Sequence, residues 1–249
     1  MSLVTMLFAG GVVSACLAPT SRIARTCAFL GMLFYGAYDN SFGKIDHGFH
    51  AWLLVSFIFI ALPEGRARSR AARHDVLTVF TTAQASFLAT YSVSGFWKLL
   101  AAVEQMGRGE VGWFSPSGFA YLTADRLGQL ASESVLGPLV IESNLVGAPL
   151  LYGGLYVELF SLAVLFRPSV HRFWGLGITV IHLGSVLVLG FGFVGNVLLA
   201  GVLLIAAPTV TDTAQTGRLR WLAALWRRLR QLPLLALVSS LFRRLRTTR

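Results

Sequence analysis

The stretch VLTVFTTAQASFLATYSVSGFWKLLAAV, residues 76–103, decides the class of fold. A helix needs about 20 predominantly apolar residues to cross the hydrocarbon core of a bilayer, and this stretch exceeds that length. Its one charged residue is Lys98. Because a charged side chain at the centre of a bilayer costs about 3 kcal/mol on insertion scales, Lys98 calls for a functional explanation.

The composition of the whole chain is that of a membrane protein. Of its 249 residues, 55% are hydrophobic and 13% are charged, whereas soluble domains contain about 25% charged residues. No polar linker divides the apolar part, so residues 1–208 are expected to form one transmembrane bundle. The first apolar run follows no basic segment, and we interpret it as a membrane helix and not as a removed signal peptide.

Seven segments are predicted to cross the membrane as helices, which makes the expected fold all-α. They are residues 2–18, 23–40, 47–63, 76–103, 149–166, 172–190 and 192–208. The last two form one apolar run that is too long for a single crossing. The glycines of GFGFVGN, residues 190–196, favour a tight reversal between them.

The positions of the basic residues predict the orientation. Of the 21 lysines and arginines, 17 lie in alternate connections of this bundle and in the segment after residue 208. Short loops rich in lysine and arginine face the cytoplasm. We therefore expect a multi-pass protein of the cell inner (plasma) membrane, with the N-terminus outside and the C-terminus inside. The net charge of +10 is explained by basic residues that face an anionic membrane surface. We therefore expect no nucleic-acid partner.

Two segments lie outside the predicted spans. Residues 104–148 combine acidic residues with apolar patches, which favours a segment that lies on the outer membrane face or dips into it, although a flexible connector has the same pattern. Residues 209–249 alternate apolar residues with arginine and are interrupted by Pro233, which predicts an interfacial amphipathic tail on the cytoplasmic side. Cys16 and Cys27 lie in apolar segments and are interpreted as inert core thiols.

Several polar residues converge on the outer half of the predicted bundle. Lys98 lies near the outer end of its span, and His50 begins the preceding span at the same level. Glu158 and His182 are placed near mid-depth. The remaining candidates are Tyr91, two turns below Lys98, Trp113 in the outer segment, and Asn196 at the start of the last span.

Intramembrane ionisable residues are candidates for function. An apolar site disfavours the charged form of an amine, and a neutral lysine can act as a general base. Each residue also has a structural interpretation: Lys98 can extend to the headgroups, and Glu158 or His182 can satisfy a neighbouring helix. The spacing of the histidines matches no metal-binding motif, so no metal site is predicted.

Four pieces of the chain resemble a known family in the same order. YSVSGFWKL (91–99) resembles the Tyr-x3-Gly-x2-Lys-Leu segment of vitamin K-dependent γ-glutamyl carboxylase and of its bacterial relatives, the proteins with a horizontally transferred transmembrane (HTTM) domain. HAWLLVSFIFIALP (50–63), GEVGWFSPSGFAYL (109–122) and residues 151–184 are similar to further segments of that family. The resemblance covers about residues 47–200.

The resemblance implies roles for particular residues. Lys98 would be the catalytic base and His50 the residue that supports the resulting anion. Independently of the resemblance, the other candidates are expected to line the substrate site: Tyr91, Trp113, Glu158, His182 and Asn196. The resemblance also implies a reduced quinone (vitamin K hydroquinone or menaquinol) and O2 as co-substrates, with CO2 if carboxylation occurs. A quinol partitions into the bilayer, and its hydroxyl loses a proton as a phenol does.

The chain leaves no room for the large soluble region with which the carboxylase holds its protein substrate, so a peptide, a lipid or a small lipophilic molecule remain alternative substrates. A membrane partner protein is a further expected partner. The competing hypothesis is a non-enzymatic membrane component that acts in binding, immunity or transport. The two hypotheses predict different results for Lys98→Met, because an enzyme needs the lysine amine for turnover and a binding protein does not.

Overall fold

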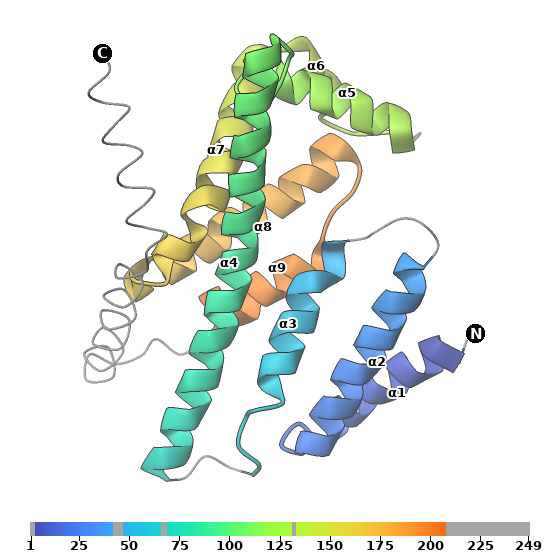
Figure 1. Cartoon of the computed structure of the whole chain (residues 1–249), viewed down its shortest axis with the longest axis vertical. Coiled ribbons are helices and arrows are strands. Elements are labelled where there is room, and N and C mark those ends of the chain that lie inside the picture. Colours follow the sequence, from blue (N-terminus) through green and yellow to red (C-terminus); the bar gives the residue numbers. More distant parts are fainter. Residues whose placement is uncertain (1–2, 42–46, 66–68, 131–132, 208–249) are drawn as a thin grey trace. The chain divides into compact units, whose positions relative to one another are not determined.

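The computed structural model describes residues 3–41, 47–65, 69–130 and 133–207, and within these ranges the protein consists of helices and turns without a β-strand (Figure 1). The predicted all-α fold is confirmed for this part of the chain. The interfacial tail predicted for residues 209–249 lies outside the described residues.

The helices follow one another with short connections. The elements up to residue 108 are α1 (Leu3–Leu17), α2 (Arg22–Asn40), the 3₁₀ turn η1 (His47–Phe49), α3 (His50–Phe59) and α4 (Arg70–Arg108). They are followed by α5 (Gly118–Leu130), α6 (Gly137–Glu142), α7 (Asn144–Val164), η2 (Pro168–Val170), α8 (His171–Leu189), α9 (Val194–Ala200) and the π-helical turn η3 (Gly201–Ile205).

Helices α1 and α2 form a close antiparallel pair. The turn between them is capped by Ser21, whose hydroxyl accepts a hydrogen bond from the Ala24 backbone N–H. Gly11 faces the backbone of α2 so closely that an added Cβ would lie 2.6 Å from the Cys27 carbonyl oxygen, and Gly31 faces α1 in the same way. Small residues at such contacts let helices approach where lipid provides no hydrophobic drive for association.

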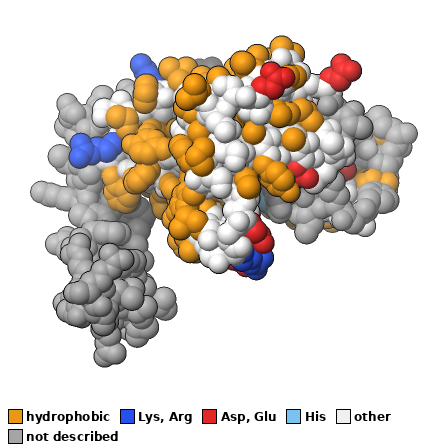
Figure 2. Space-filling view, turned by 90° about the horizontal axis from the view of Figure 1, so that it is seen from above, with side chains coloured by type: hydrophobic (Ala, Val, Ile, Leu, Met, Phe, Trp, Pro, Cys, Tyr) orange, Lys and Arg blue, Asp and Glu red, His pale blue; other side chains and the backbone are white. Residues whose placement is uncertain are grey.

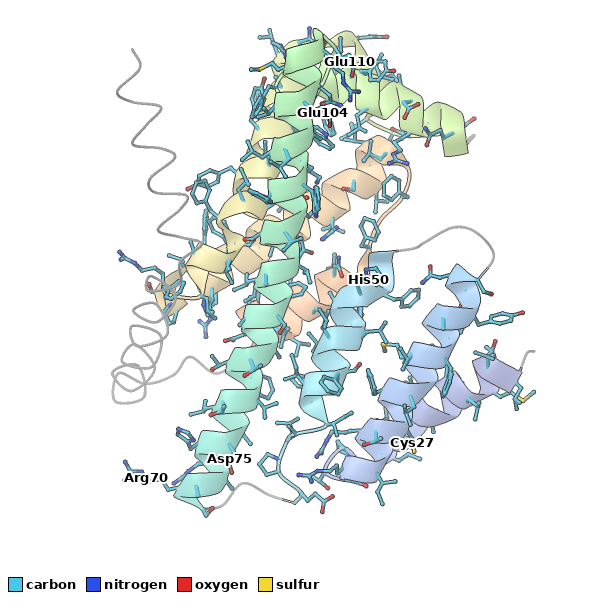
Figure 3. The ribbon with its side chains drawn as sticks, in the orientation of Figure 1. Cys27, His50, Arg70, Asp75, Glu104 and Glu110 are labelled. Carbon is cyan, nitrogen blue, oxygen red and sulfur yellow. The ribbon has the colours of Figure 1, made fainter. Side chains whose placement is uncertain are left out.

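Helix α4 is the longest element and runs past both ends of the predicted span 76–103. Its N-terminus is capped by the Ser69 hydroxyl, and it ends at Gly109, whose φ of 70° is left-handed backbone that glycine adopts readily. At 39 residues, α4 is about 58 Å long, nearly twice the thickness of a bilayer core. Figure 3 shows Arg70 and Asp75 near one end of α4 and Glu104 and Glu110 near the other.

The main core lies where α3, α4, α7, α8, α9 and η3 meet. Its fully buried large side chains include Phe87 and Leu88 from α4, Ile178 from α8, and Leu203 and Leu204 from η3. A second, smaller cluster joins Val140 of α6 to Val188 and Leu189 at the end of α8. The segment that follows α4 is therefore packed onto the helices that carry the polar candidates.

The π-helical turn η3 is held by a polar side chain from α4. The buried Gln84 amide donates a 2.7 Å hydrogen bond to the Leu203 carbonyl oxygen. A π turn widens the helix and disturbs its regular backbone ladder, so a side chain from a neighbouring helix can reach a carbonyl there. This bond fixes η3 against the half of α4 that lies toward Arg70.

The outer surface of the helices is largely apolar, as Figure 2 shows for one face. Large hydrophobic side chains that are more than half exposed include Phe96 and Trp97 on α4, Leu145 at the start of α7, and Val180 and Leu183 on α8. Within the described residues, three helices are long and apolar enough to cross a membrane: α4, α7 and the stretch Pro168–Leu189. Helices α1, α3 and α9 with η3 are apolar but shorter.

Each of the seven predicted segments contains a helix. The described part of residues 104–148 contains the end of α4, all of α5 and α6, and the start of α7, and its expected place on a membrane face stays a prediction. The expectation that Cys16 and Cys27 are core thiols is wrong, because both side chains are exposed: the buried positions of α1 and α2 are Gly11, Ala24, Arg25, Gly31, Met32 and Gly36.

The close contact between α4 and α7 predicts different effects for two glycines of α4. A Cβ at Gly95 would lie 2.7 Å from the Leu159 backbone nitrogen and 2.9 Å from the Glu158 Cβ, whereas a Cβ at Gly107 meets nothing within 4 Å. We expect Gly95→Ala to lower the free energy of unfolding by about 1–3 kcal/mol through overpacking. Unfolding in mixed micelles titrated with SDS measures the change, and Gly107→Ala, expected to be neutral or slightly stabilising, is the matched control. Equal effects of the two substitutions would contradict the packing described here.

Candidate functional site

An ion pair joins α4 to α7. The Lys98 Nζ lies 2.5 Å from Oε1 and 2.6 Å from Oε2 of Glu158, and 29% of the lysine side chain and 12% of the glutamate side chain are exposed. Both residues come from helices that can cross a membrane. In such surroundings a carboxylate partner offsets the cost of a charged amine, so the pair explains how Lys98 is tolerated.

Trp113 covers the amine. The Lys98 Nζ lies 5.1 Å from the centroid of the Trp113 ring, within the range of a cation–π interaction. The segment that carries Trp113 is tied back to its surroundings: the Gln105 side chain accepts from the Trp113 N–H, and the Tyr152 hydroxyl donates to the Phe114 carbonyl oxygen at 2.9 Å. The segment after α4 therefore places an aromatic face against the ion pair.

A second polar group lies two turns before Lys98 on α4. The Tyr91 hydroxyl lies 2.5 Å from Nε2 of His182 on α8, and both side chains are only 7% exposed. The side chain of Asn196, in the first turn of α9, lies within hydrogen-bonding reach of Tyr91. The rings of Phe87 and Phe193 pack edge-on against this group. Three helices thus contribute one side chain each to a polar cluster with aromatic walls.

The two groups share one face of α4. Tyr91, Gly95 and Lys98 follow the i, i+4, i+7 spacing that puts helical residues on one side. The seven residues from Tyr91 to Lys98 correspond to about 10 Å along the helix.

Six of the seven candidates are therefore brought together: Tyr91, Lys98, Trp113, Glu158, His182 and Asn196. His50 differs from them, because its side chain is exposed. It is the first residue of α3, as Figure 3 shows. Lys98 pairs with Glu158 and Trp113 and not with His50. The role expected for His50 stays a prediction, and the buried imidazole of the cluster is that of His182.

Two expectations about this site are corrected by its geometry. The sequence places Lys98 near the outer end of its span and Glu158 at mid-depth, but the two side chains are in contact. The reason is that α4 continues to Arg108 and α7 already begins at Asn144, so Lys98 lies ten residues, about 15 Å, from the end of its helix. The isolated neutral amine expected from the sequence is instead an amine held by a carboxylate.

Sequence reasoning missed the residues that position Glu158. The Ser92 hydroxyl donates to the Leu159 carbonyl oxygen at 3.1 Å and accepts from the Leu162 N–H at 2.8 Å, so it attaches α4 to the turn of α7 that carries the glutamate. Gly95 permits the close approach at the same level. The signal was present in the small residues Ser92 and Gly95, within two turns of Lys98, because small residues mark close helix contacts in a membrane.

Polar burial also occurs away from this site. Arg25 is 8% exposed and donates to the Pro19 carbonyl oxygen at 2.7 Å and to the Leu62 carbonyl oxygen at 2.5 Å, which ties the α1–α2 turn to the end of α3. Trp174 donates to the Ser161 hydroxyl at 2.9 Å between α8 and α7. In both cases the partners are protein groups that need a donor, so these residues have structural roles. Among the residues that the structure describes, no cluster of three histidine, cysteine or acidic side chains could hold a metal ion.

The chain was compared with protein-family models, with curated proteins and with solved structures, and none of the three comparisons finds a match.

The ion pair predicts a strong coupling between its two partners. Replacing one of them, in Lys98→Met or in Glu158→Leu, leaves the other charge unpaired among apolar helices, and we expect a loss of about 3 kcal/mol in the free energy of unfolding. The double variant Lys98→Met/Glu158→Leu should recover most of that loss, because it removes both charges. SDS titration in mixed micelles gives all four values of the double-mutant cycle.

The exposed pair of Arg108 with Glu104, near the end of the same helix, is the control. Glu104→Gln should change the free energy of unfolding by no more than about 0.5 kcal/mol. If the two single substitutions at positions 98 and 158 are additive, the pair does not stabilise the fold in the way described.

Proposed function

We propose that the protein is a multi-pass membrane enzyme that removes a proton from a lipophilic hydroxyl compound of the quinol type, with Lys98 as the base. The observation that carries the proposal is the Lys98–Glu158 pair under the Trp113 ring, within helices that can cross a membrane. A structural ion pair needs neither an aromatic cover nor a second polar cluster about 10 Å away along the same helix, and this site has both.

The chemistry follows from the pair. A carboxylate in direct contact with an ammonium group can take up its proton in surroundings of low dielectric constant, which leaves a neutral amine beside a neutral acid. The neutral Lys98 amine then accepts a proton from the bound hydroxyl. The ammonium group that results stabilises the anion left behind, so the same side chain acts as base and as electrostatic partner.

The spacing of the site suits an aromatic diol. Lys98 and Tyr91 are about 10 Å apart along α4, a length that one aromatic ring with polar atoms at opposite ends fits when a hydrogen bond is made at each end. Trp113, Phe87 and Phe193 supply aromatic walls. A reduced quinone would supply the phenolic hydroxyl and, once deprotonated, a ring that reacts with O2. Whether CO2 and a peptide are consumed in a later step depends on the resemblance to the carboxylase family.

The proposed location is the cell inner membrane, with seven spans and the N-terminus outside. The three long apolar helices and the basic residues in alternate connections support this location. Two exposed residues on opposite sides of the predicted topology are Arg70 and Gln129.

Thiol labelling of intact cells tests this orientation. In a variant in which Cys16 and Cys27 are replaced by serine, a membrane-impermeant maleimide should label Gln129→Cys in intact cells and Arg70→Cys only after permeabilisation. The physical reason is that the arginine-rich connection stays in the cytoplasm. Labelling of both positions from the same side would refute the proposed topology.

Turnover by the purified protein in liposomes tests the reaction. With menaquinol and O2 supplied, oxygenated quinone products are followed by mass spectrometry against empty liposomes, which report spontaneous oxidation. We expect the double variant Lys98→Met/Glu158→Leu, which keeps the fold, to lose roughly 10²- to 10⁴-fold in rate, the usual contribution of a general base.

The control for this experiment is Trp97→Phe, next to Lys98 in sequence but 66% exposed on the lipid-facing side. It should turn over at the wild-type rate. Turnover by the double variant at the wild-type rate would exclude Lys98 as the base. A wild-type protein that binds menaquinol without converting it would favour the competing hypothesis of a non-enzymatic binding component.

A further inference from the structure

The cluster of Tyr91, His182 and Asn196 contains two buried polar atoms without a protein partner among the described residues. They are Nδ1 of His182 and Oδ1 of Asn196. Buried polar atoms are nearly always hydrogen-bonded, so each unsatisfied atom requires an explanation. Here the two belong to side chains that are joined through a single tyrosine hydroxyl, and the imidazole is 7% exposed.

The direction of the hydrogen bonds follows from which atoms remain open. Since Oδ1 of Asn196 is unpaired, the Asn196 amide nitrogen is the group that donates to the Tyr91 oxygen. The Tyr91 hydroxyl proton is then directed to Nε2 of His182. A neutral imidazole that accepts at Nε2 carries its proton on Nδ1. The cluster therefore presents one open donor, the His182 Nδ1–H, and one open acceptor, the Asn196 Oδ1.

We infer that His182 and Asn196 bind the polar head of a lipophilic ligand that carries both an acceptor and a donor, of which a phenolic hydroxyl is the simplest. The inference rests on the proposed function, because it assigns the recognition of the substrate to the end of the site opposite Lys98. Tyr91 is a positioning residue in this arrangement: its hydroxyl sets the tautomer of His182 and the orientation of the Asn196 amide. The aromatic rings of Phe87 and Phe193 form the apolar surroundings of that head group.

A pair of aromatic probes tests the inference. The purified full-length protein in nanodiscs is titrated with 1-naphthol and with 1-methoxynaphthalene, and uptake by empty nanodiscs is subtracted. The hydroxyl both donates and accepts, whereas the methyl ether only accepts. We expect 1-naphthol to bind at least roughly tenfold more tightly, because a site built to pair a hydroxyl strongly disfavours an analogue that leaves its buried acceptor unpaired. Equal affinity for the two probes would overturn the inference, since the open atoms are then satisfied by water.

Three variants locate the preference. Asn196→Leu removes the acceptor and should bring the two affinities to within about twofold. Tyr91→Phe should weaken the preference for 1-naphthol, because it releases the side chains of His182 and Asn196. Asn144→Leu, at an exposed asparagine in the first turn of α7, is the matched control and should keep the wild-type preference. A preference that survives in both Asn196→Leu and Tyr91→Phe would also overturn the inference.

A measurement on the wild-type protein covers the case in which Asn196→Leu or Tyr91→Phe fails to fold. With ¹⁵N-labelled histidine, saturation with 1-naphthol should move the Nδ1 resonance of one histidine, and an unchanged spectrum contradicts the inference. The double variant Lys98→Met/Glu158→Leu separates this inference from the proposed reaction. It should retain the preference for 1-naphthol even though it has lost turnover, and loss of the preference in this folded variant would show that the hydroxyl is bound at the ion pair instead.

Discussion

The site depends on one interaction, the ion pair of Lys98 with Glu158 between α4 and α7. A charged amine among apolar helices is unfavourable unless a counter-charge is held within contact distance, and the counter-charge is unfavourable without the amine. The two helices must therefore meet at one level and in one rotational setting. Gly95 and Ser92 make this possible, the first by leaving room for the α7 backbone and the second by pairing with it.

Once α4 and α7 are fixed in this way, the other elements complete a polar site with an aromatic enclosure. The segment after α4 brings Trp113 over the amine, and α8 and α9 bring His182 and Asn196 to Tyr91. Each polar side chain comes from a different turn or helix, and each is held by at least one further contact. Such an arrangement restricts the rotamers of the side chains, which a site for binding and proton transfer requires.

The positions of the helices could be predicted from the sequence because apolar length and turn residues are local properties. The predicted span 23–40 differs from α2 by one residue, and 172–190 differs from α8 by one residue at each end. The length of α4 was underestimated because hydropathy falls near both ends, while its true limits are set by the Ser69 cap and by Gly109. Helices α5 and α6 were missed because their mixed composition resembles that of a connecting segment.

The site was predictable in its members but not in its pairs. Intramembrane polarity selected Lys98, Glu158 and His182, since each is conspicuous in an apolar segment. Which of them are in contact depends on the register between helices. Small residues and the true helix ends set this register, and counting residues from the ends of predicted spans does not include them. His50 shows the limit of placing residues by their expected depth, because depth does not tell whether a side chain is buried: His50 begins α3 with an exposed side chain.

The π-helical turn η3 has a consequence for the register of α9. Gln84 bonds to Leu203, and Tyr91 bonds to Asn196, so the two bonds are seven residues apart on α4 and seven residues apart on the α9–η3 segment, in opposite directions. Two antiparallel helices attached at two such points cannot slide past each other by one turn without losing both attachments at once. The position of Asn196 is thus set in part by Gln84, which lies two turns before Tyr91 on α4 and outside the cluster that Asn196 belongs to.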